Sequence, residues 1–335
     1  MTEREEKLLA WLCDQTGKQH ELVPASSDAS FRRYFRIELE DGSRIVMDAP
    51  PPQEDCRPFI HVAALLGQAG LNAPRVLADD LEAGFLLLDD LGNRTYLDML
   101  NAETVERLYG DALGALNMMQ TRVDIQSAEL PVYDASLLGN ELALFHDWYL
   151  QKHCGITLTA SQERIWQQTC QTLIESALAQ PVVCVHRDYH SRNLMHTEGN
   201  NPGILDFQDA VTGPVTYDLV SLLRDCYISW PREQVEDWVQ GFYRQTVHAG
   251  IISEDEVSGT QFLEWFDLMG VQRHLKAIGI FARLLHRDGK QGYIKDIPRT
   301  LSYVLDVSAR HLLLQDFYAM LQSLNLSDAE SATLS

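Results

Sequence analysis

Apolar residues recur along the first ninety positions with two different periods. Residues 2–14 repeat apolar side chains at helical spacing, which predicts a helix that leads into the next segment. Over residues 31–40 the apolar side chains stand largely on odd positions, as they do in a half-buried strand. Asp41-Gly42 then turns the chain into residues 43–48, and because this dipeptide favours tight turns between strands, the segment is predicted to be a β-hairpin.

One more helix and two more strands are predicted after the hairpin. Residues 58–69 have helical periodicity, and the short apolar runs 75–77 and 85–88 are typical of strands. We expect residues 1–90 to form an amino-terminal lobe that consists of a five-stranded antiparallel sheet with one helix; these patterns place four of its strands, and the helix over residues 2–14 leads into it.

Helical periodicity dominates the rest of the chain, from residue 91 to residue 335. Helices are predicted over 104–120, 135–153, 161–179, 233–248, 261–286 and 299–324. The main interruption is the segment 182–206, in which short apolar runs flank a polar loop. The fold class is therefore α+β, with a mainly helical carboxy-terminal lobe that presents one functional loop.

Length and composition limit the classes of function. The chain has 335 residues, of which 45% are hydrophobic and 22% charged, and this suits a globular protein with two lobes or domains. A formal net charge of -21 opposes binding to nucleic acid or to an anionic membrane surface. No run approaches the roughly 20 apolar residues of a membrane span, and the acidic start is unlike a basic signal peptide. We expect a cytoplasmic protein.

The strongest chemical signal lies between His186 and Asp206. From residue 186 the chain reads H-R-D-Y-H-S-R-N, and G-I-L-D-F ends the next apolar run. Asp188 thus precedes Asn193 by five positions and Asp206 by eighteen, which matches H-R-D-x-x-x-x-N followed by an aspartate-phenylalanine pair. This pattern is typical of kinases.

Each of these three side chains fits one role in phosphoryl transfer. Asn193 and Asp206 offer oxygen ligands of the kind that Mg²⁺ prefers, so we expect them to hold the metal of Mg-ATP. Asp188 is then left as the general base, which accepts the proton of the substrate hydroxyl. ATP and Mg²⁺ are the expected cofactors.

Two other interpretations use the same segment. Asp188 and Asn193 could be loop residues that satisfy backbone groups, since aspartate and asparagine favour turns. His186 and His190 stand four apart, as in a zinc-binding H-E-x-x-H, but the glutamate and a helical setting are missing. The catalytic roles are filled in the right chain order, which favours phosphoryl transfer.

A hinge is predicted where the last amino-terminal strand ends. Asp89, Asp90 and Leu91 follow that strand, where a two-lobed nucleotide-binding protein connects its lobes and presents backbone groups to a purine. This prediction rests on position alone.

These residues resemble the aminoglycoside phosphotransferase family and its relatives, the choline and homoserine kinases. Residues 185–193, 204–207 and Gly213 with Asp218-Leu219 correspond to that family's catalytic loop, metal-binding strand and following helix start. The resemblance implies the two-lobed fold of the protein kinases. Residues 1–90 would then bind nucleotide, and residues 91–335 would carry the catalytic loop and the sugar site.

The chain is also similar, over nearly its full length, to a narrower group of kinases that act on amino sugars in bacterial cell-wall recycling. Segments 26–36, 46–51, 205–209 and 272–276 carry this resemblance. It implies transfer of the ATP γ-phosphate to the anomeric C1 hydroxyl of N-acetylmuramate or N-acetylglucosamine. It also implies that residues 26–33 form a lid over the phosphates.

The resemblance includes Ser27 and Ser30 among the ATP-binding residues of that lid. One feature of the broader family is missing, because residues 45–48 on the third strand contain no phosphate-pairing lysine. We predict that Arg33 takes its place, since a guanidinium can clamp phosphate through two hydrogen bonds. The fallback candidates are Arg32 and Arg36, and it is equally open that these arginines only cover a strand face.

Positive charge near the loop indicates how an acceptor could be bound. Arg187, His190, Arg192 and Arg224 place positive charge near the loop, which would suit the lactyl carboxylate of a muramic acid, although any of them could be structural. Of these, His190, Arg192 and Arg224 are predicted to bind substrate. The acidic chain as a whole would suit a polycationic aminoglycoside better. Net charge, however, governs steering rather than pocket shape.

These observations predict a monomeric kinase whose partner is a small amino sugar. One alternative is a kinase of aminoglycosides or of other small-molecule hydroxyls. Another is a catalytically inactive, nucleotide-binding regulator, which the missing lysine favours and the complete catalytic set opposes. The preferred sugar stays open.

Overall fold

Two compact units make up the structure. The computed structural model describes residues 2–27, 31–324 and 326. Unit 1 consists of the described parts of Met1–Val123 and Arg192–Ala210, and unit 2 of those of Asp124–Ser191 and Val211–Ser335. The chain therefore returns to unit 1 for one short segment directly after the catalytic loop. The predicted division by ligand, with nucleotide bound by residues 1–90 and sugar by residues 91–335, stays a prediction.

Unit 1 contains the predicted five-stranded antiparallel sheet, in the order β1-β2-β3-β5-β4. Its strands are β1 Val23–Ser27, β2 Arg33–Leu39, β3 Gly42–Asp48, β4 Val76–Asp80 and β5 Phe85–Asp89. The hairpin of β2 and β3 runs in continuous register from Arg33 opposite Asp48 to Leu39 opposite Gly42. Gly42 has a φ of 122°, a conformation that side chains rarely permit, and this explains the turn.

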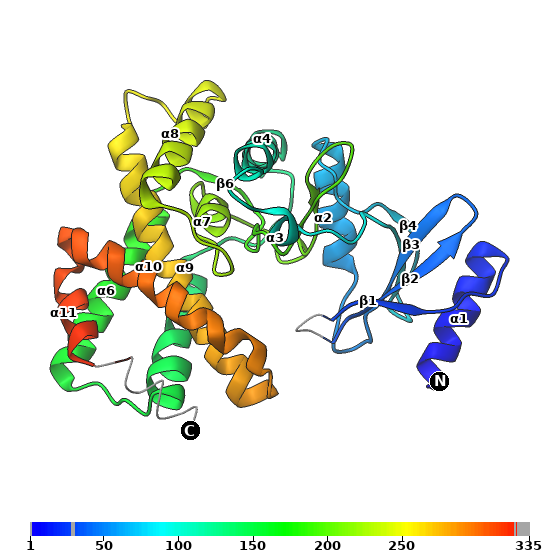
Figure 1. The fold of residues 1–335 in the computed structure, drawn as a ribbon, viewed down its shortest axis with the longest axis horizontal. Helices are drawn as coiled ribbons and strands as arrows, with labels where there is room; N and C mark the ends of the chain where they lie inside the picture. Colours follow the sequence, from blue (N-terminus) through cyan, green and yellow to red (C-terminus); the bar gives the residue numbers. More distant parts are fainter. Residues whose placement is uncertain (1, 28–30, 325, 327–335) are drawn as a thin grey trace. The chain divides into compact units, whose positions relative to one another are not determined.

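The helix α1, Glu3–Thr16, covers one face of this sheet (Figure 1). Thr2 and Glu5 form a capping box at its start, and Gly17 ends it in the left-handed conformation. Leu8 and Leu12 are fully buried against apolar side chains of the sheet, namely Phe35, Ile37, Val46, Phe85 and Leu87. The helix predicted over residues 2–14 is confirmed.

A short hairpin in unit 1 carries two of the predicted site residues at its ends. The remaining elements of this unit are α2 Arg57–Gln68, α3 Tyr96–Met99, α4 Val105–Arg122, β7 Leu194–Met195 and β8 Gly203–Ile204. β7 pairs with β8 in antiparallel fashion. A Cβ at Gly203 would come within 2.9 Å of Leu91 Cδ1 and 3.2 Å of Met195 Cβ, so a larger residue here would require these side chains to shift.

Unit 2 is mainly helical, and α9, Gly259–Asp288, runs through it (Figure 1). Its other helices are α5 Ala135–Leu144, η1 Phe145–His153, α6 Ala160–Leu178, α7 Tyr217–Leu223, α8 Arg232–His248, η2 Gln291–Asp296, α10 Ile297–Arg310, η3 Leu312–Leu314 and α11 Gln315–Ser323. Side chains of α9 such as Leu275 and Ile278 share one core with Leu142, Phe145 and Val304. The strands β6 Val182–Val185 and β9 Val211–Pro214 pair antiparallel beside the catalytic loop.

Two long predicted helices are divided in the structure. The segment 135–153 begins as α5 but continues as the π-helix η1, whose wider turns keep the same apolar side inward. Gly279 of α9 approaches the Leu144 backbone so closely at this junction that a Cβ would lie 2.3 Å from the Leu144 carbonyl carbon. The segment 299–324 is interrupted after Arg310, where His311 takes an extended conformation.

The observed elements confirm the predicted α+β class, with an antiparallel sheet toward the amino terminus and helices in the carboxy-terminal part. In the part of the chain that the structure describes, no helix combines the length and the apolar character that crossing a membrane requires.

Candidate active site

The predicted catalytic loop follows β6 in unit 2 and is held by buried carboxylates. Asp218 in α7 is fully buried and accepts hydrogen bonds from the backbone N–H groups of His186, at 2.6 Å, and Arg187, at 3.0 Å. Asp225, which follows α7, accepts a hydrogen bond from the Ser191 N–H at 3.0 Å. These bonds satisfy backbone donors before and after the candidate base, and so they fix the course of the loop.

Asp218 is itself titratable. Burial raises the pKa of the Asp218 carboxyl to about 7. The N–H donors of His186 and Arg187 act in the opposite direction, because they bind the ionised form. The pKa of Asp218, the residue that orients the loop, therefore depends on the groups around it.

Asp188 lies half-buried in this loop, among cationic side chains. Its N–H donates to His186 Nδ1 at 3.2 Å, and its carbonyl accepts from the His190 N–H at 3.0 Å. Burial alone would raise the pKa of the Asp188 carboxyl, but nearby cations, Lys276 foremost, lower it below its usual value. The other groups that lower it are His190, Arg273 and His186. Asp188 is thus ionised, as a general base must be.

Unit 1 brings Asn193 and Asp206 together across the β7–β8 hairpin. The Leu205 N–H donates to the Asn193 carbonyl at 2.9 Å, and Asn193 Nδ2 donates to Asp206 Oδ2 at 3.2 Å. Asp206 has a φ of 62°, in the left-handed region that aspartate enters more readily than most residues. An amide and a carboxylate therefore lie side by side, and their role as two ligands of one metal ion stays a prediction.

Gln208 supports this pair from the same segment. Its Nε2 donates to Asp206 Oδ1 at 2.8 Å, whereas its Oε1 is buried without a hydrogen-bond partner in the described structure. A buried carbonyl oxygen is unfavourable unless something donates to it or is coordinated by it. The oxygens of Asn193, Asp206 and Gln208 fit Mg²⁺, which uses few protein ligands and keeps several waters.

This oxygen set is different from a zinc centre. Among the described residues, no three His, Cys, Asp or Glu side chains gather as a metal centre of that kind would require. A magnesium site built from one carboxylate and neutral amides does not depend on such a cluster.

Arg33, the predicted phosphate clamp, is bound by carboxylates in the structure. Its Nη2 and Nε donate to Asp48 Oδ2 at 2.6 and 3.0 Å, and its Nη1 donates to Glu5 Oε1 at 3.0 Å. Asp48 is fully buried on the third strand and also pairs with Arg4, at 2.6 Å. The strand that lacks the family's lysine thus carries a carboxylate between two arginines. The role of Arg33 stays a prediction.

The predicted hinge residues also form ion pairs. Arg36 Nε and Nη2 donate to Asp90 at 2.5 and 3.0 Å, and Asp89 pairs with Arg75 at 2.6 Å. Leu91 is half-buried. These ion pairs use the side chains of the segment. The predicted contact of its backbone groups with a nucleotide stays a prediction.

The predicted lid is only partly described. Ser27 ends β1 with its backbone opposite Arg33, while Ser30 lies outside the described residues. Arg32, a fallback phosphate clamp, lies 3.6 Å from Glu54. All three candidate arginines therefore have carboxylate partners.

The three predicted substrate-binding residues are divided between the units. His190 and Arg224 belong to unit 2, and the half-buried Arg192 belongs to unit 1. His190 contacts Tyr227 edge-on, with ring centroids 5.4 Å apart. The buried Arg224 guanidinium lies 5.3 Å from the centroid of the Tyr303 ring, and burial lowers the pKa of Arg224. Their contacts with substrate stay predictions.

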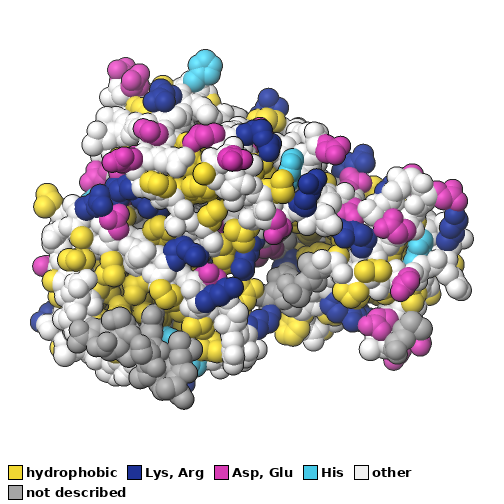
Figure 2. Space-filling view, in the orientation of Figure 1, with side chains coloured by type: hydrophobic (Ala, Val, Ile, Leu, Met, Phe, Trp, Pro, Cys, Tyr) yellow, Lys and Arg dark blue, Asp and Glu magenta, His cyan; other side chains and the backbone are white. Residues whose placement is uncertain are grey.

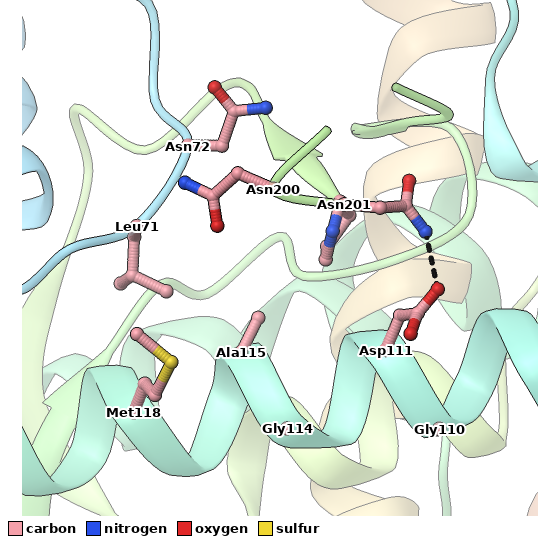
Figure 3. Close-up of a pocket in the computed structure, with 10 residues that line it drawn as sticks. Leu71, Asn72, Gly110, Asp111, Gly114, Ala115, Met118, Asn200 and Asn201 are labelled. Carbon is pink, nitrogen blue, oxygen red and sulfur yellow. Dashed lines mark hydrogen bonds between the residues drawn. The ribbon is translucent and has the colours of Figure 1, made fainter. Parts of the chain in front are cut away.

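A separate cavity of about 260 Å³ lies within unit 1 (Figure 3). It is lined by Leu71, Asn72, Gly110, Asp111, Gly114, Ala115, Met118, Asn200, Asn201 and Pro202. Asn201 Nδ2 donates to Asp111 at 2.8 Å, Asn72 to Thr197 at 3.3 Å, and Asn200 to the Gly70 carbonyl at 3.4 Å. These bonds attach the loop between β7 and β8 to Gly70, Asn72 and Asp111. The polar side chains that line the cavity therefore have a structural role.

Charged side chains of both signs are interspersed on the face shown in Figure 2. On this face, therefore, the acidic side chains that contribute to the net charge of -21 are not gathered at one place. Such a distribution suits a small-molecule substrate that is recognised locally.

Several residues that support the site were given no role by the sequence analysis. Asp218 and Asp225 hold the loop, and Lys276 lowers the pKa of Asp188. One signal could have found Lys276, because Gln272, Arg273, His274 and Lys276 are the polar residues of a stretch, 268–282, that is otherwise apolar. All four are buried, which makes polar partners obligatory.

Comparison with known proteins agrees with this geometry. A model of the phosphotransferase enzyme family matches residues 21–250, a range that includes the catalytic loop and the β7–β8 hairpin. The N-acetylmuramate/N-acetylglucosamine kinase of Pseudomonas aeruginosa is 52% identical over 304 residues, which cover 91% of this chain and 88% of that protein. The protein of the same name from Neisseria meningitidis serogroup B is 44% identical over 339 residues and covers 99% and 98%.

A solved structure shows the same fold. The GDP complex of aminoglycoside 2'-phosphotransferase-IIIa matches with a TM-score of 0.60, covering 92% of this chain and 99% of that chain. The sequence identity is 15%, so this likeness concerns the fold alone. The predicted protein-kinase-like fold is confirmed.

Proposed function

Since the chain belongs to the phosphotransferase enzyme family, we propose that it uses Mg-ATP to phosphorylate the anomeric hydroxyl of N-acetylmuramate or N-acetylglucosamine. One observation carries the proposal: Asp188, Asn193 and Asp206 occur in kinase order within a chain whose relatives are named as kinases of these two sugars. The retained catalytic set argues against an inactive regulator.

In this proposal Asp188 handles the proton of the acceptor. It accepts the proton of the C1 hydroxyl while that oxygen forms a bond to the γ-phosphorus and the bond to the β–γ bridging oxygen breaks, which leaves ADP. The cations around Asp188 keep its carboxylate ionised before the proton arrives. Asp218 and Asp225 hold the loop, so the carboxylate keeps its orientation.

Asn193 and Asp206 are proposed to hold the magnesium ion of Mg-ATP, with Gln208 positioning Asp206. A bound magnesium ion neutralises the charge of the phosphates and of the group in transfer. The hairpin supplies these oxygens from a tightly packed turn, and this limits how far they can move apart.

The nucleotide is proposed to contact the lid and the hinge. Arg33 would bind phosphate, Ser27 and Ser30 would lie in the lid, and the segment from Asp89 through Asp90 to Leu91 would face the purine. Arg33 can exchange its carboxylate partner for a phosphate, because Arg4 continues to neutralise the buried Asp48.

The acceptor is proposed to be a small amino sugar bound by a monomer. His190, Arg192 and Arg224 provide the positive charge that a lactyl carboxylate would need. N-acetylglucosamine has no such carboxylate, so these residues would matter more for N-acetylmuramate.

A sugar panel tests the proposal directly. The purified protein is incubated with Mg-ATP and with N-acetylmuramate, N-acetylglucosamine, glucosamine or an aminoglycoside, and ADP release and products are measured. The expected product is an acid-labile anomeric phosphate of one or both N-acetylated sugars. An acid-stable 6-phosphate, or no product with any sugar, would reject the assignment.

An aminoglycoside is the second candidate acceptor, because the net charge of -21 would attract a polycation. Turnover of the aminoglycoside without turnover of any N-acetylated sugar would replace the proposed function by this one. Turnover of the sugars alone would exclude it.

A further inference from the structure

Arg187, the residue before the candidate base, has a backbone conformation that arginine rarely adopts. Its φ is 77°, in the left-handed region that favours glycine. A non-glycine residue in this region carries backbone strain and persists only where its surroundings hold it. Asp218 holds the backbone N–H of Arg187, and the contacts of the Arg187 side chain show what else holds this residue.

A buried ion triad includes the Arg187 side chain. Arg187 Nη2 donates to Glu141 Oε1 at 2.6 Å, and Lys276 Nζ lies 3.0 Å from the same oxygen. The side chains of Glu141 and Lys276 are 6% and 9% exposed. The three charges come from α5, the catalytic loop and α9, so the triad connects three segments that are far apart in sequence.

Neutral polar groups form further hydrogen bonds with Glu141 and Lys276. Tyr133 Oη and Gln272 Nε2 both donate to Glu141 Oε2. Lys276 Nζ also donates to Tyr217 Oη, at 2.9 Å. Both oxygens of the buried carboxylate therefore have donors, and its position is determined from several directions.

The charges of the triad do not cancel. Burial alone would raise the pKa of the Glu141 carboxyl, but Lys276 and then Arg187 lower it below its usual value. One carboxylate thus serves two cations, and the surplus positive charge lies beside Asp188. Burying three ions is a poor way to stabilise a fold, because the loss of hydration opposes the ionic attraction. This indicates a positional role.

We infer that Glu141, Arg187 and Lys276 form a positioning device that holds Arg187 in its left-handed conformation and thereby fixes the direction of the Asp188 side chain. The inference rests on the proposed function, in which Asp188 is the base. It also explains the buried polar run of α9, since Gln272 and Lys276 are the contribution of that helix to the device.

Substituting glycine for Arg187 distinguishes the effect of backbone strain from the effect of losing the side-chain contacts. Glycine adopts a φ of 77° without strain, so Arg187→Gly needs no side-chain anchor. Arg187→Ala keeps the strain and loses the anchor, which makes it the matched control. In Arg187→Gly the buried Glu141 still has Lys276 as a partner, so the pair left behind is balanced.

The test combines these variants with Glu141→Gln. In the wild-type background, Glu141→Gln is expected to lower kcat by about 10- to 100-fold with little change in KM for ATP, because the strained loop relaxes. In the Arg187→Gly background the same change is expected to lower kcat by less than about threefold. Arg187→Gly should therefore rescue Glu141→Gln, and Arg187→Ala should not.

Two results would overturn the inference. Equal losses of kcat in both backgrounds would show that Glu141 acts on something other than the Arg187 backbone. Rescue by alanine as well as by glycine would show that strain at residue 187 is irrelevant. If Glu141→Gln does not fold, the two single variants decide, because Arg187→Gly is expected to be about tenfold more active than Arg187→Ala.

Amide hydrogen exchange separates failure of this inference from failure of the proposed function. Exchange of residues 186–191 is expected to speed up by about tenfold or more in Glu141→Gln and to return toward wild type in the double variant with Arg187→Gly. This holds even if no sugar is phosphorylated. Unchanged exchange in Glu141→Gln would overturn the inference, while the sugar panel judges the function on its own.

Discussion

Charged side chains are used in opposite ways in the two units. In unit 1 the Arg33 and Arg75 side chains are themselves 40% and 79% exposed, and the buried partner of Arg33, Asp48, has Arg4 as a second cation, whereas in unit 2 Glu141 and Lys276 are both almost completely buried. An exposed ion pair contributes about 0–1 kcal/mol and can exchange partners, but breaking a buried one costs about 3–5 kcal/mol. We infer from the comparison that the exposed Arg33 can bind a ligand, whereas the buried Lys276 determines geometry.

The largest effect on kcat is expected at Asp188, the proposed base, which lies in unit 2. Asp188→Asn removes the proton acceptor and should lower kcat by about 10²- to 10⁴-fold, with nucleotide binding nearly unchanged. Steady-state kinetics and ATP titration measure the two quantities. The exposed Asp237→Asn in the same unit is the control, and near-normal turnover of Asp188→Asn would refute its role.

A smaller effect is expected at the hairpin of unit 1. Asp206→Asn removes the only charge from the proposed ligand set, so the apparent Mg²⁺ affinity should fall by about 10- to 100-fold, the range for one interaction with a charged group. Turnover measured against Mg²⁺ concentration checks this. The exposed Asp79→Asn serves as control. An unchanged magnesium dependence would remove Asp206 from the site.

Removing the charge of Arg33 in unit 1 should change the KM for ATP. Arg33→Met is expected to raise KM for ATP about tenfold and to leave KM for the sugar unchanged, since a charged hydrogen bond to phosphate is lost. Arg44→Met, which breaks the exposed pair with Asp41, should change neither value. If Arg33→Met leaves KM for ATP unchanged and Arg32→Met or Arg36→Met raises it, the clamp is a different arginine.

The smallest expected effect concerns a buried neutral group of unit 2. Burial, and then Arg273, lowers the pKa of His274 to about 3, below its unfolded value of about 6.5. The stability linked to this group is therefore fully present above pH 6.5 and is lost as the pH falls toward 3, at about 1.4 kcal/mol per pH unit. His274→Gln cannot titrate, so its stability should fall less steeply.

Urea unfolding at pH 7.5 and 5.5 measures this difference. Between these values the wild type should lose about 1 kcal/mol more than His274→Gln. The exposed His248→Gln should behave like the wild type. Parallel losses in wild type and His274→Gln would mean that His274 is not held neutral by the fold.

Elements with strong local signals could be predicted from the sequence. The helical period of residues 2–14, the Asp41-Gly42 turn and the helical period of α9 all act within a few residues, and the structure has each of them. The division of 135–153 into α5 and η1 could not be predicted, because a π-helix keeps a similar apolar side and the residue that packs closely at the junction, Gly279, belongs to a helix distant in sequence. The break at His311 carries neither glycine nor proline as a signal.

The same limit applies to the site. The spacing of Asp188, Asn193 and Asp206 is local, and the order of their roles could be predicted from the motif. The groups that orient them are distant in sequence, since Glu141 and Lys276 meet Arg187 only through packing of α5 and α9. The same holds for the three candidate phosphate-binding arginines, whose carboxylate partners were not apparent from the sequence.

The position of the transferred phosphate is the most direct test of the whole account. N-acetylglucosamine or N-acetylmuramate labelled with ¹³C at C1 is incubated with the protein and Mg-ATP, and the product is observed by ³¹P NMR. The account predicts a product signal split by coupling to the labelled C1. An unsplit sugar phosphate, or no sugar phosphate at all, would contradict it.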